Sequence, residues 1–317
     1  MKVAFCGAWH VHAPDYARHA AELGEIVGIY EPNEQLRAAF LQRFPVPVFS
    51  SLDEFLASDA EGVIVCSATC DHADQMIRIA RAGKHIFTEK VLALSDEDCA
   101  RVAEAVRESG VRFVISLFQK TIAPVLTLKQ VVDGGELGRL NYARFRNCHS
   151  GSVGDWLPAH FYNERECGGG AMIDLGAHGM YLLHWLLGEP RAARSVFTTC
   201  CERESVKAKN VDGVEDNAVS VMRFADGVIG INETGFVSAV SPVVLEVYGE
   251  QGYVRMEGST VQKCSAATER RLLDVPLVDA RPLPIVAFLT GADTTGLGID
   301  EACSLTHMMV LAYAGRA

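Results

Sequence analysis

The sequence is short of basic residues and contains no long apolar run. Its 317 residues include 29 lysines and arginines against 40 aspartates and glutamates, a formal net charge of −11. Without a basic stripe that could release counterions from phosphates, the chain is not expected to bind nucleic acid. No apolar segment approaches the ~20 residues that span a bilayer, so no membrane partner is expected.

A signal-peptide pattern and paired cysteines are also missing. The apolar run at the start is interrupted by Trp9, His10 and His12, so it lacks the hydrophobic segment of a secretory signal. The ten cysteines show no C-x-x-C spacing, and in a reducing compartment such residues mostly behave as small buried hydrophobes. We therefore expect a cytoplasmic protein without disulfide bonds.

The first 118 residues alternate between strand and helix patterns. Such alternation predicts βαβ units and a doubly wound parallel sheet, the Rossmann class of α/β fold. Strands are predicted at 2–6, 25–30, 62–66, 84–88 and 112–116. Helices are predicted at 15–23, 33–44, 72–82 and 95–109. We expect residues 1–118 to form one domain.

The remaining residues, 119–317, show a different order of elements. Helices are predicted at 121–132, 171–187, 282–291 and 299–314, and strands near 193–202, 217–224, 228–236, 243–248 and 252–256. Runs of strands after an α/β half predict a C-terminal α+β domain built on a large, mostly antiparallel sheet. We expect residues 119–317 to form this second domain.

The loop after the first strand, CGAWHVHAP, stands where a dinucleotide-binding loop is expected. Gly7 holds the first glycine position of that loop, whereas Trp9 and His12 occupy the second and third. Pro14 favours a first helical turn that begins near residue 13. Glu31 ends the second strand, where a carboxylate can accept ribose hydroxyls and repel a 2′-phosphate, which predicts NAD rather than NADP. Alternatively, Glu31 only caps the turn that follows it.

The same loop permits two other hypotheses. His10 and His12 form an H-x-H pair that could bind a metal, as in amidohydrolase-type hydrolases. Gly7 should already end the strand, however, and the second half lacks the repeated β/α units of a barrel, so we predict no metal. The lost loop glycines also leave open a non-redox enzyme or a ligand sensor, with NAD held tightly or lost.

Several motifs occur together in one order along the chain. They are GKHIFTEK at 83–90, GGGAMIDLGAH at 168–178, RFADG at 223–227 and YGEQG at 248–252. In these the sequence resembles the Gfo/Idh/MocA family of nicotinamide-dependent oxidoreductases over nearly its whole length. The resemblance implies NAD as cofactor, a sugar, cyclitol or related polyol as small-molecule substrate, and a homo-oligomer, either a dimer or a tetramer. It also implies that residues 119–317 bind the substrate and form the contacts of the oligomer.

Asp174 and His178 are the candidate catalytic pair. They are four residues apart, so on one helix they share a face, and the carboxylate could orient the imidazole. Histidine titrates near neutral pH, as a base that accepts a hydroxyl proton must. The alternative is a buried structural histidine.

Lys90 follows a strand at the carboxyl edge of the sheet, where ligands bind in open α/β folds. The resemblance implies that Lys90 reaches the reacting hydroxyl or the nicotinamide ribose and that Glu89 lies on the cofactor side. Val91 stands in place of the usual proline, which puts a cis peptide after Lys90 in doubt.

Other positions follow from the resemblance. Cofactor contacts are implied for Gly7, Trp9, His10, His12, Glu31, Ser67, Ala68 and His72, and substrate contacts for Gln119, Trp156, His160 and Tyr181. For His72 the alternative is an ordinary residue at a helix start, and for Trp156 and His160 it is packing. Tyr181 replaces a second aspartate of the family, which removes one acceptor for polyol hydroxyls.

Overall fold

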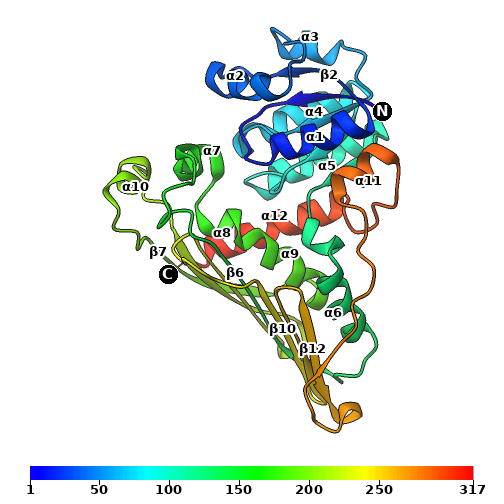
Figure 1. Ribbon diagram of the computed structural model, residues 1–317, viewed down its shortest axis with the longest axis vertical. Helices are drawn as coiled ribbons and strands as arrows, with labels where there is room; N and C mark the ends of the chain where they lie inside the picture. Colours follow the sequence, from blue (N-terminus) through cyan, green and yellow to red (C-terminus); the bar gives the residue numbers. More distant parts are fainter. Residues whose placement is uncertain (317) are drawn as a thin grey trace. The chain divides into compact units, whose positions relative to one another are not determined.

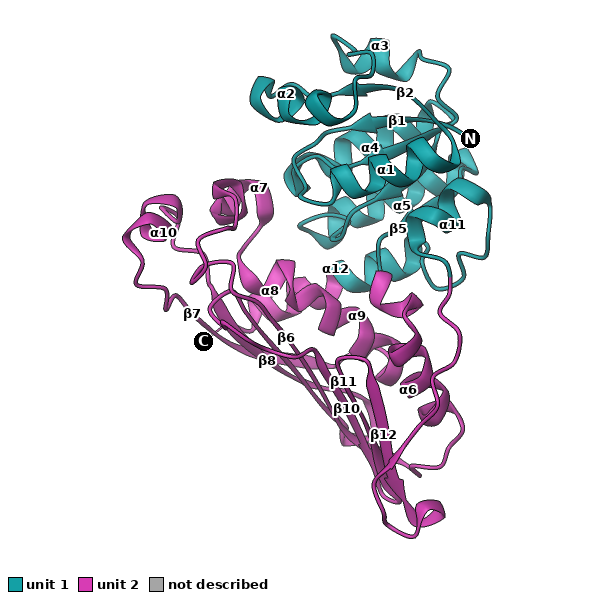
Figure 2. Cartoon of the chain, viewed as in Figure 1, with its two compact units in different colours: residues 1–117, 282–306 teal, residues 118–281, 307–317 magenta. Residues whose placement is uncertain are grey.

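The computed structural model describes residues 1–316 and divides the chain into two compact units (Figure 2). The first holds Met1–Leu117 and Pro282–Thr306, and the second holds Phe118–Arg281 and the chain from His307 onward. Residues 282–306 thus pack with the first unit, although the sequence analysis assigned them to the C-terminal domain. Helix α11 (Pro284–Thr290) explains the difference, because it packs against helix α1 (Ala13–Leu23).

The first unit is built on a five-stranded sheet in which each neighbouring pair is parallel (Figure 1). The strands are β1 (Lys2–Cys6), β2 (Glu25–Tyr30), β3 (Gly62–Val65), β4 (His85–Thr88) and β5 (Phe113–Ile115), in the order β2-β1-β3-β4-β5. Its other helices are α2 (Glu34–Arg43), α3 (Leu52–Leu56), α4 (His72–Arg81) and α5 (Asp96–Ser109). The predicted Rossmann fold is confirmed.

Local sequence explains where these helices begin and end. The Ser95 hydroxyl accepts the amide N–H of Asp98 and caps α5, and Gly110, at φ +64°, ends that helix. Pro14 lies in the first turn of α1, which begins at Ala13 as predicted.

The second unit contains an eight-stranded sheet with the order β13-β12-β11-β10-β6-β9-β8-β7. The strands are β6 (Leu140–Cys148), β7 (Ala192–Thr198), β8 (Asn217–Arg223), β9 (Ile229–Gly235), β10 (Val244–Gly249), β11 (Gly252–Glu257), β12 (Thr260–Ser265) and β13 (Leu273–Asp274). Every pair is antiparallel except β6 with β9. The predicted large, mostly antiparallel sheet is therefore confirmed.

Helices of the second unit lie against this sheet and beside it (Figure 1). They are α6 (Ala123–Asp133), α7 (Glu164–Cys167), α8 (Ala171–Asp174), α9 (Gly176–Leu187) and α10 (Glu204–Lys209), and α12 (Ile299–Ala314) runs through both units. Within residues 1–316 no helix is long and apolar enough to cross a bilayer.

Several elements differ from the sequence prediction: the short helices α3, α7 and α10 and the strands β12 and β13 were not predicted. Strand β6 was not predicted, because Arg144 and Arg146 make it look like a polar loop, but the Glu233 carboxylate on the neighbouring strand accepts hydrogen bonds from both guanidinium groups. The predicted helix 171–187 is two helices that meet at Leu175.

Candidate functional site

The loop after β1 begins with a glycine that no other residue could replace without strain. Gly7 adopts φ +89°, and a Cβ at this position would lie 2.4 Å from the amide nitrogen of Ser67. Its own amide donates to the carbonyl oxygen of Tyr30 at 2.8 Å. The tight turn predicted at Gly7 is therefore present, and it brings the loop after β1 against the loop after β3.

These two loops flank the point where the strand order reverses, because β2 and β3 lie on opposite sides of β1. Dinucleotides bind at such a switch point in open α/β sheets. The amide of His10 donates to the carbonyl oxygen of Cys66 at 3.0 Å, which holds the loops together. The loop keeps the tight turn at Gly7, but the Ser67 backbone fills the space beside that glycine, and buried Trp9 leaves the loop bulkier than a glycine-rich one.

Glu31 is only 5% exposed, and its carboxylate is engaged by backbone. One oxygen accepts the amide of Ala8 at 2.7 Å and the other accepts the amide of Asn33 at 2.8 Å. Burial raises the pKa of Glu31, and these two hydrogen bonds oppose that rise. Glu31 therefore stabilises the turn that follows it, as the second interpretation of the sequence predicted. A contact between Glu31 and a ribose stays a prediction.

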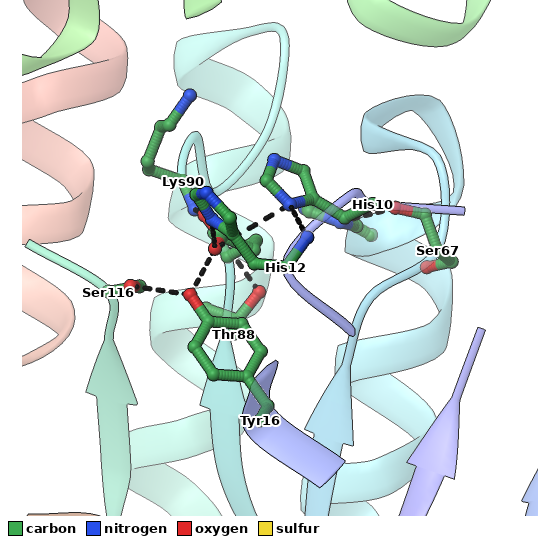
Figure 3. A network of polar contacts seen from close by, with 9 residues as sticks. His10, His12, Tyr16, Ser67, Thr88, Lys90 and Ser116 are labelled. Carbon is green, nitrogen blue, oxygen red and sulfur yellow. Dashed lines mark hydrogen bonds and ion pairs between the residues drawn. The ribbon is translucent and has the colours of Figure 1, made fainter. Parts of the chain in front are cut away.

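Glu89, directly after β4, is buried and is the centre of a polar cluster. Figure 3 labels its neighbours His10, His12, Tyr16 and Lys90. Its Oε1 lies 2.8 Å from Nδ1 of His12 and 3.6 Å from Nδ1 of His10, and it accepts the Tyr16 hydroxyl. Its Oε2 accepts the amide of Lys90 at 3.0 Å. Burial alone would raise the pKa of Glu89, but the charges of His10 and His12 hold it well below its usual range.

Sequence reasoning did not identify Tyr16 and Ser116 as members of this cluster. The Tyr16 hydroxyl lies 2.8 Å from the Ser116 hydroxyl and also donates a hydrogen bond to Glu89. Tyr16 follows His12 by four residues at the start of α1, and this spacing was the available signal. Nothing in the sequence connects Ser116, one hundred positions further on, to the same group.

Lys90 lies beside this cluster, and its side chain extends away from the dashed contacts of His12 and Tyr16 (Figure 3). The peptide bond between Lys90 and Val91 is cis although residue 91 is not proline, so the doubt that the sequence raised does not hold. His72, 1% exposed, has Nδ1 3.0 Å from the carbonyl oxygen of Val91 and Nε2 3.2 Å from that of Ser67. Its ring thus joins two loops, which disfavours a direct nitrogen contact with a cofactor, and burial lowers its pKa.

In the second unit, His178 is 5% exposed, and its Nδ1 lies 2.9 Å from the hydroxyl of Tyr181. That hydroxyl also accepts the amide of Gln119 at 3.2 Å, and the Phe118 ring meets the imidazole edge-on at 5.1 Å. Asp174 is the last residue of α8 and α9 begins at Gly176, with Leu175 between them in helical conformation. Orientation of His178 by Asp174 stays a prediction.

The Gln119 side chain has a buried acceptor with no hydrogen-bond partner in the described part of the chain. A buried acceptor without a partner is costly, so a ligand hydroxyl that supplied the missing hydrogen bond would be favoured. Trp156 is 53% exposed and donates to Ser150, whereas His160 packs against Phe161. Substrate contacts by Trp156 and His160 stay predictions.

The glycine segment before α8 is held by two residues that the sequence analysis did not identify. Oε1 of Glu215 accepts the amides of Gly170 and Met172 at 3.1 and 3.0 Å and the Tyr313 hydroxyl at 2.7 Å. A Cβ on Gly169 would lie 2.0 Å from that hydroxyl. The glycines are therefore needed because Glu215 and Tyr313 pack directly against their backbone.

Comparison with known proteins agrees with this geometry. A family model described as an oxidoreductase family with an NAD-binding Rossmann fold matches residues 1–117, and the GFO/IDH/MocA C-terminal domain matches residues 125–255. The chain is 26% identical over 235 residues to 1,5-anhydro-D-fructose reductase of Ensifer adhaerens, covering 72% of this chain and 67% of that protein. It is 28% identical over 166 residues to inositol 2-dehydrogenase of Salmonella paratyphi B, covering 49% of this chain and 46% of that protein.

A solved structure of levoglucosan dehydrogenase in complex with NADH and levoglucosan superimposes with a TM-score of 0.81 at 20% identity. The superposition covers 99% of this chain and 96% of that one, so the two proteins share their whole fold. Two family models that follow each other along the chain, together with the two sheets described above, bear out the resemblance in the sequence. The chain therefore belongs to the Gfo/Idh/MocA family of oxidoreductases, and its first unit is an NAD-binding Rossmann domain.

Proposed function

We propose that the protein is an NAD-dependent dehydrogenase that acts on a hydroxyl group of a sugar, cyclitol or related polyol. The observation that carries this proposal is the buried group formed by His178, Tyr181 and Gln119. A base and an unpartnered acceptor within one buried group suit a substrate that carries several hydroxyls. The relatives named above, which act on an anhydrosugar or on inositol, support the same substrate class.

In this proposal each residue has one chemical task. Bound NAD supplies or accepts the hydride at its nicotinamide ring. His178, oriented by Asp174, accepts the proton of the reacting hydroxyl, and the ammonium of Lys90 stabilises the charge that develops on that oxygen. Residues proposed to hold the cofactor are Gly7, Trp9, His10, His12, Glu31, Ser67, Ala68 and Glu89, with His72 as a support for their loops.

Specificity for a polyol is assigned to residues of the second unit. The free acceptor of Gln119 would take one substrate hydroxyl, because a site with an unpartnered polar atom rejects ligands that cannot supply the missing hydrogen bond. Trp156 and His160 would cover a face of the sugar ring. Tyr181 supplies a phenol where the family has a carboxylate, so its hydroxyl serves the imidazole of His178.

The test is NADH formation from NAD⁺ with a panel of sugars, anhydrosugars and cyclitols. His178→Asn should lower kcat by ~10²–10⁴-fold, the usual contribution of a general base. His184→Asn on the same helix is the matched control, since that imidazole pairs with Glu189. Turnover that survives in His178→Asn would remove the catalytic assignment.

A second candidate is a non-redox enzyme or a ligand sensor with NAD held tightly or lost. It is favoured by the engaged carboxylate of Glu31 and by the single glycine of the loop. Denaturing the purified protein and measuring released nicotinamide cofactor separates this candidate from a net dehydrogenase. Stoichiometric released cofactor without turnover on any substrate would favour it.

We also propose a homo-oligomer, a dimer or a tetramer, joined through the sheet face that α8 and α9 do not cover. Apolar side chains on β7, β8 and β9 point to that face: Val196, Val219, Val221 and Ile229 are 60, 37, 42 and 43% exposed. Val196 and Val219 are paired across β7 and β8, so they form one apolar patch. Light scattering of the wild type and of Val219→Asp tests this, and a monomeric wild type would refute it.

A further inference from the structure

The cluster around Glu89 contains a set of atoms that is spaced like the ligands of a metal ion. Nδ1 of His10, Nδ1 of His12 and one carboxylate oxygen of Glu89 lie within 4.8 Å of one another. A metal bound at ~2.0–2.2 Å by nitrogen and oxygen requires its ligand atoms to be ~3–3.5 Å apart. The two distances from Glu89, 2.8 Å to His12 and 3.6 Å to His10, lie just outside that range on either side, so binding an ion requires small movements of these side chains.

We propose that His10, His12 and Glu89 bind one divalent transition-metal ion. Two imidazole nitrogens and one carboxylate oxygen are the donor set of zinc and non-haem iron sites, and hard oxygen-preferring ions such as Mg²⁺ are disfavoured by it. Three protein ligands leave at least one coordination position for water or for a ligand oxygen, as in catalytic rather than structural sites. The site lies wholly within the first unit.

The ligands are held by backbone whose position is fixed. The amide of His10 donates to Cys66 at 3.0 Å, and the amide of Glu89 donates to Val65 at 3.3 Å, so both ligand segments are tied to the end of β3. The loop reaches α1 directly after His12, which further limits its movement. A site on such a scaffold needs little rearrangement to accept an ion.

A second layer of hydrogen bonds orients the carboxylate. The Tyr16 hydroxyl donates to Oε1 of Glu89, and the amide of Lys90 donates to Oε2. Outer partners of this kind are a regular feature of metal sites and fix how a ligand carboxylate faces the ion. A structural ion pair between Glu89 and His12 would not need the second imidazole of His10 beside it.

Metal binding would replace two hydrogen bonds that the histidines make. The proton shared by His12 and Glu89 is released when the metal binds. The hydrogen bond from the amide of His12 to Nδ1 of His10, which is 3.3 Å long, is also lost. That long bond is weak, so its loss costs little beside two metal–nitrogen bonds. The sequence analysis considered His10 and His12 as a metal-binding pair and predicted no metal, because nothing in the sequence placed Glu89, 77 positions after His12, beside them.

The test uses the full chain, purified without a histidine tag and stripped with a chelator. Co²⁺ is titrated while its visible absorption bands are followed, and Zn²⁺ retained after dialysis is counted by mass spectrometry. The wild type should bind about one equivalent, as a single preformed site predicts. Affinity should fall at least ~10-fold in His12→Gln and in Glu89→Gln.

His12→Gln is the decisive variant, because the His12 side chain is 42% exposed and its replacement leaves the core intact. His19→Gln, on α1 and outside the cluster, is the matched control and should bind like the wild type. A wild type that retains no metal, or a His12→Gln variant that binds as tightly as the wild type, would overturn the proposal.

Failure of this proposal is distinguishable from failure of the proposed dehydrogenase function. NADH binding is measured separately on the same stripped protein through quenching of tryptophan fluorescence. NADH binding without metal binding overturns only the metal site, whereas a bound metal without NADH binding or turnover supports the metal site and contradicts the dehydrogenase.

Discussion

Replacing Glu215 by alanine removes the acceptor that three donors share around the glycine segment before α8. The amides of Gly170 and Met172 and the hydroxyl of Tyr313 all donate to its Oε1, and Glu215 is 6% exposed. Each buried donor left without a partner costs ~1–3 kcal/mol. At the lower figure, Glu215→Ala should reduce the free energy of unfolding by about 3 kcal/mol.

Tyr313→Phe removes only one of these donors and should cost about 1 kcal/mol. Because the bond between Tyr313 and Glu215 is lost in both single variants, the double variant should cost about 1 kcal/mol less than their sum. Glu250→Ala is the control, since Glu250 pairs with Arg139 on the surface, and it should change stability by less than ~0.5 kcal/mol.

Urea unfolding followed by tryptophan fluorescence measures these changes in the free energy of unfolding. Turnover of the same variants measures whether they also affect His178 on α9. A loss below about 1 kcal/mol in Glu215→Ala would refute the reasoning, because it would mean that the three donors find other partners. Strict additivity in the double variant would show that Tyr313 and Glu215 act independently.

Three further predictions follow from the geometry. Gly7→Ala should lower the free energy of unfolding and the affinity for NADH far more than Gly83→Ala. Both glycines have a positive φ, but only at Gly7 would a new Cβ collide with other atoms. Equal losses for the two variants in urea unfolding would contradict this. Tyr181→Phe should lower kcat about fivefold, by loss of one hydrogen bond to His178, with KM for NAD⁺ unchanged; steady-state kinetics decides. Burial raises the pKa of Glu31, so the Glu31 carboxyl binds a proton more tightly in the folded protein than in the unfolded chain. The free energy of unfolding should therefore fall as pH rises from 4.5, the ordinary pKa of the group, through the raised pKa of the folded state. Glu31→Gln should flatten this fall in urea midpoints measured across that range, and an unchanged slope would contradict it.

The sequence was informative where local pattern decides structure. Alternating strand and helix periods predicted the parallel sheet, and Pro14 predicted where α1 begins. Strand β6 was missed because Arg144 and Arg146 look exposed until Glu233 on a neighbouring strand is placed beside them. Cross-strand neutralisation of this kind depends on register, which local sequence does not contain.

The candidate site shows the same limit more strongly. Lys90 and His178 were found through motifs, but the contacts of Glu89 with His12 and Tyr16 join segments more than 70 positions apart. The structure places the Tyr181 hydroxyl at Nδ1 of His178, a contact that the sequence analysis did not predict, and the orientation of His178 by Asp174 stays a prediction. Tyr181 follows His178 by three positions on α9, so the helical spacing of the two residues was the available signal.

The return of residues 282–306 to the first unit has a consequence for synthesis on the ribosome. Helix α11 covers α1, and the Phe288 ring lies 5.8 Å from that of Phe87, yet α11 is translated only after the whole eight-stranded sheet. Until then the nascent first unit exposes an apolar surface that only the end of the chain can cover. A released fragment of residues 1–117 should therefore aggregate more readily than the full chain, and newly made chains should depend on chaperones until translation is nearly complete.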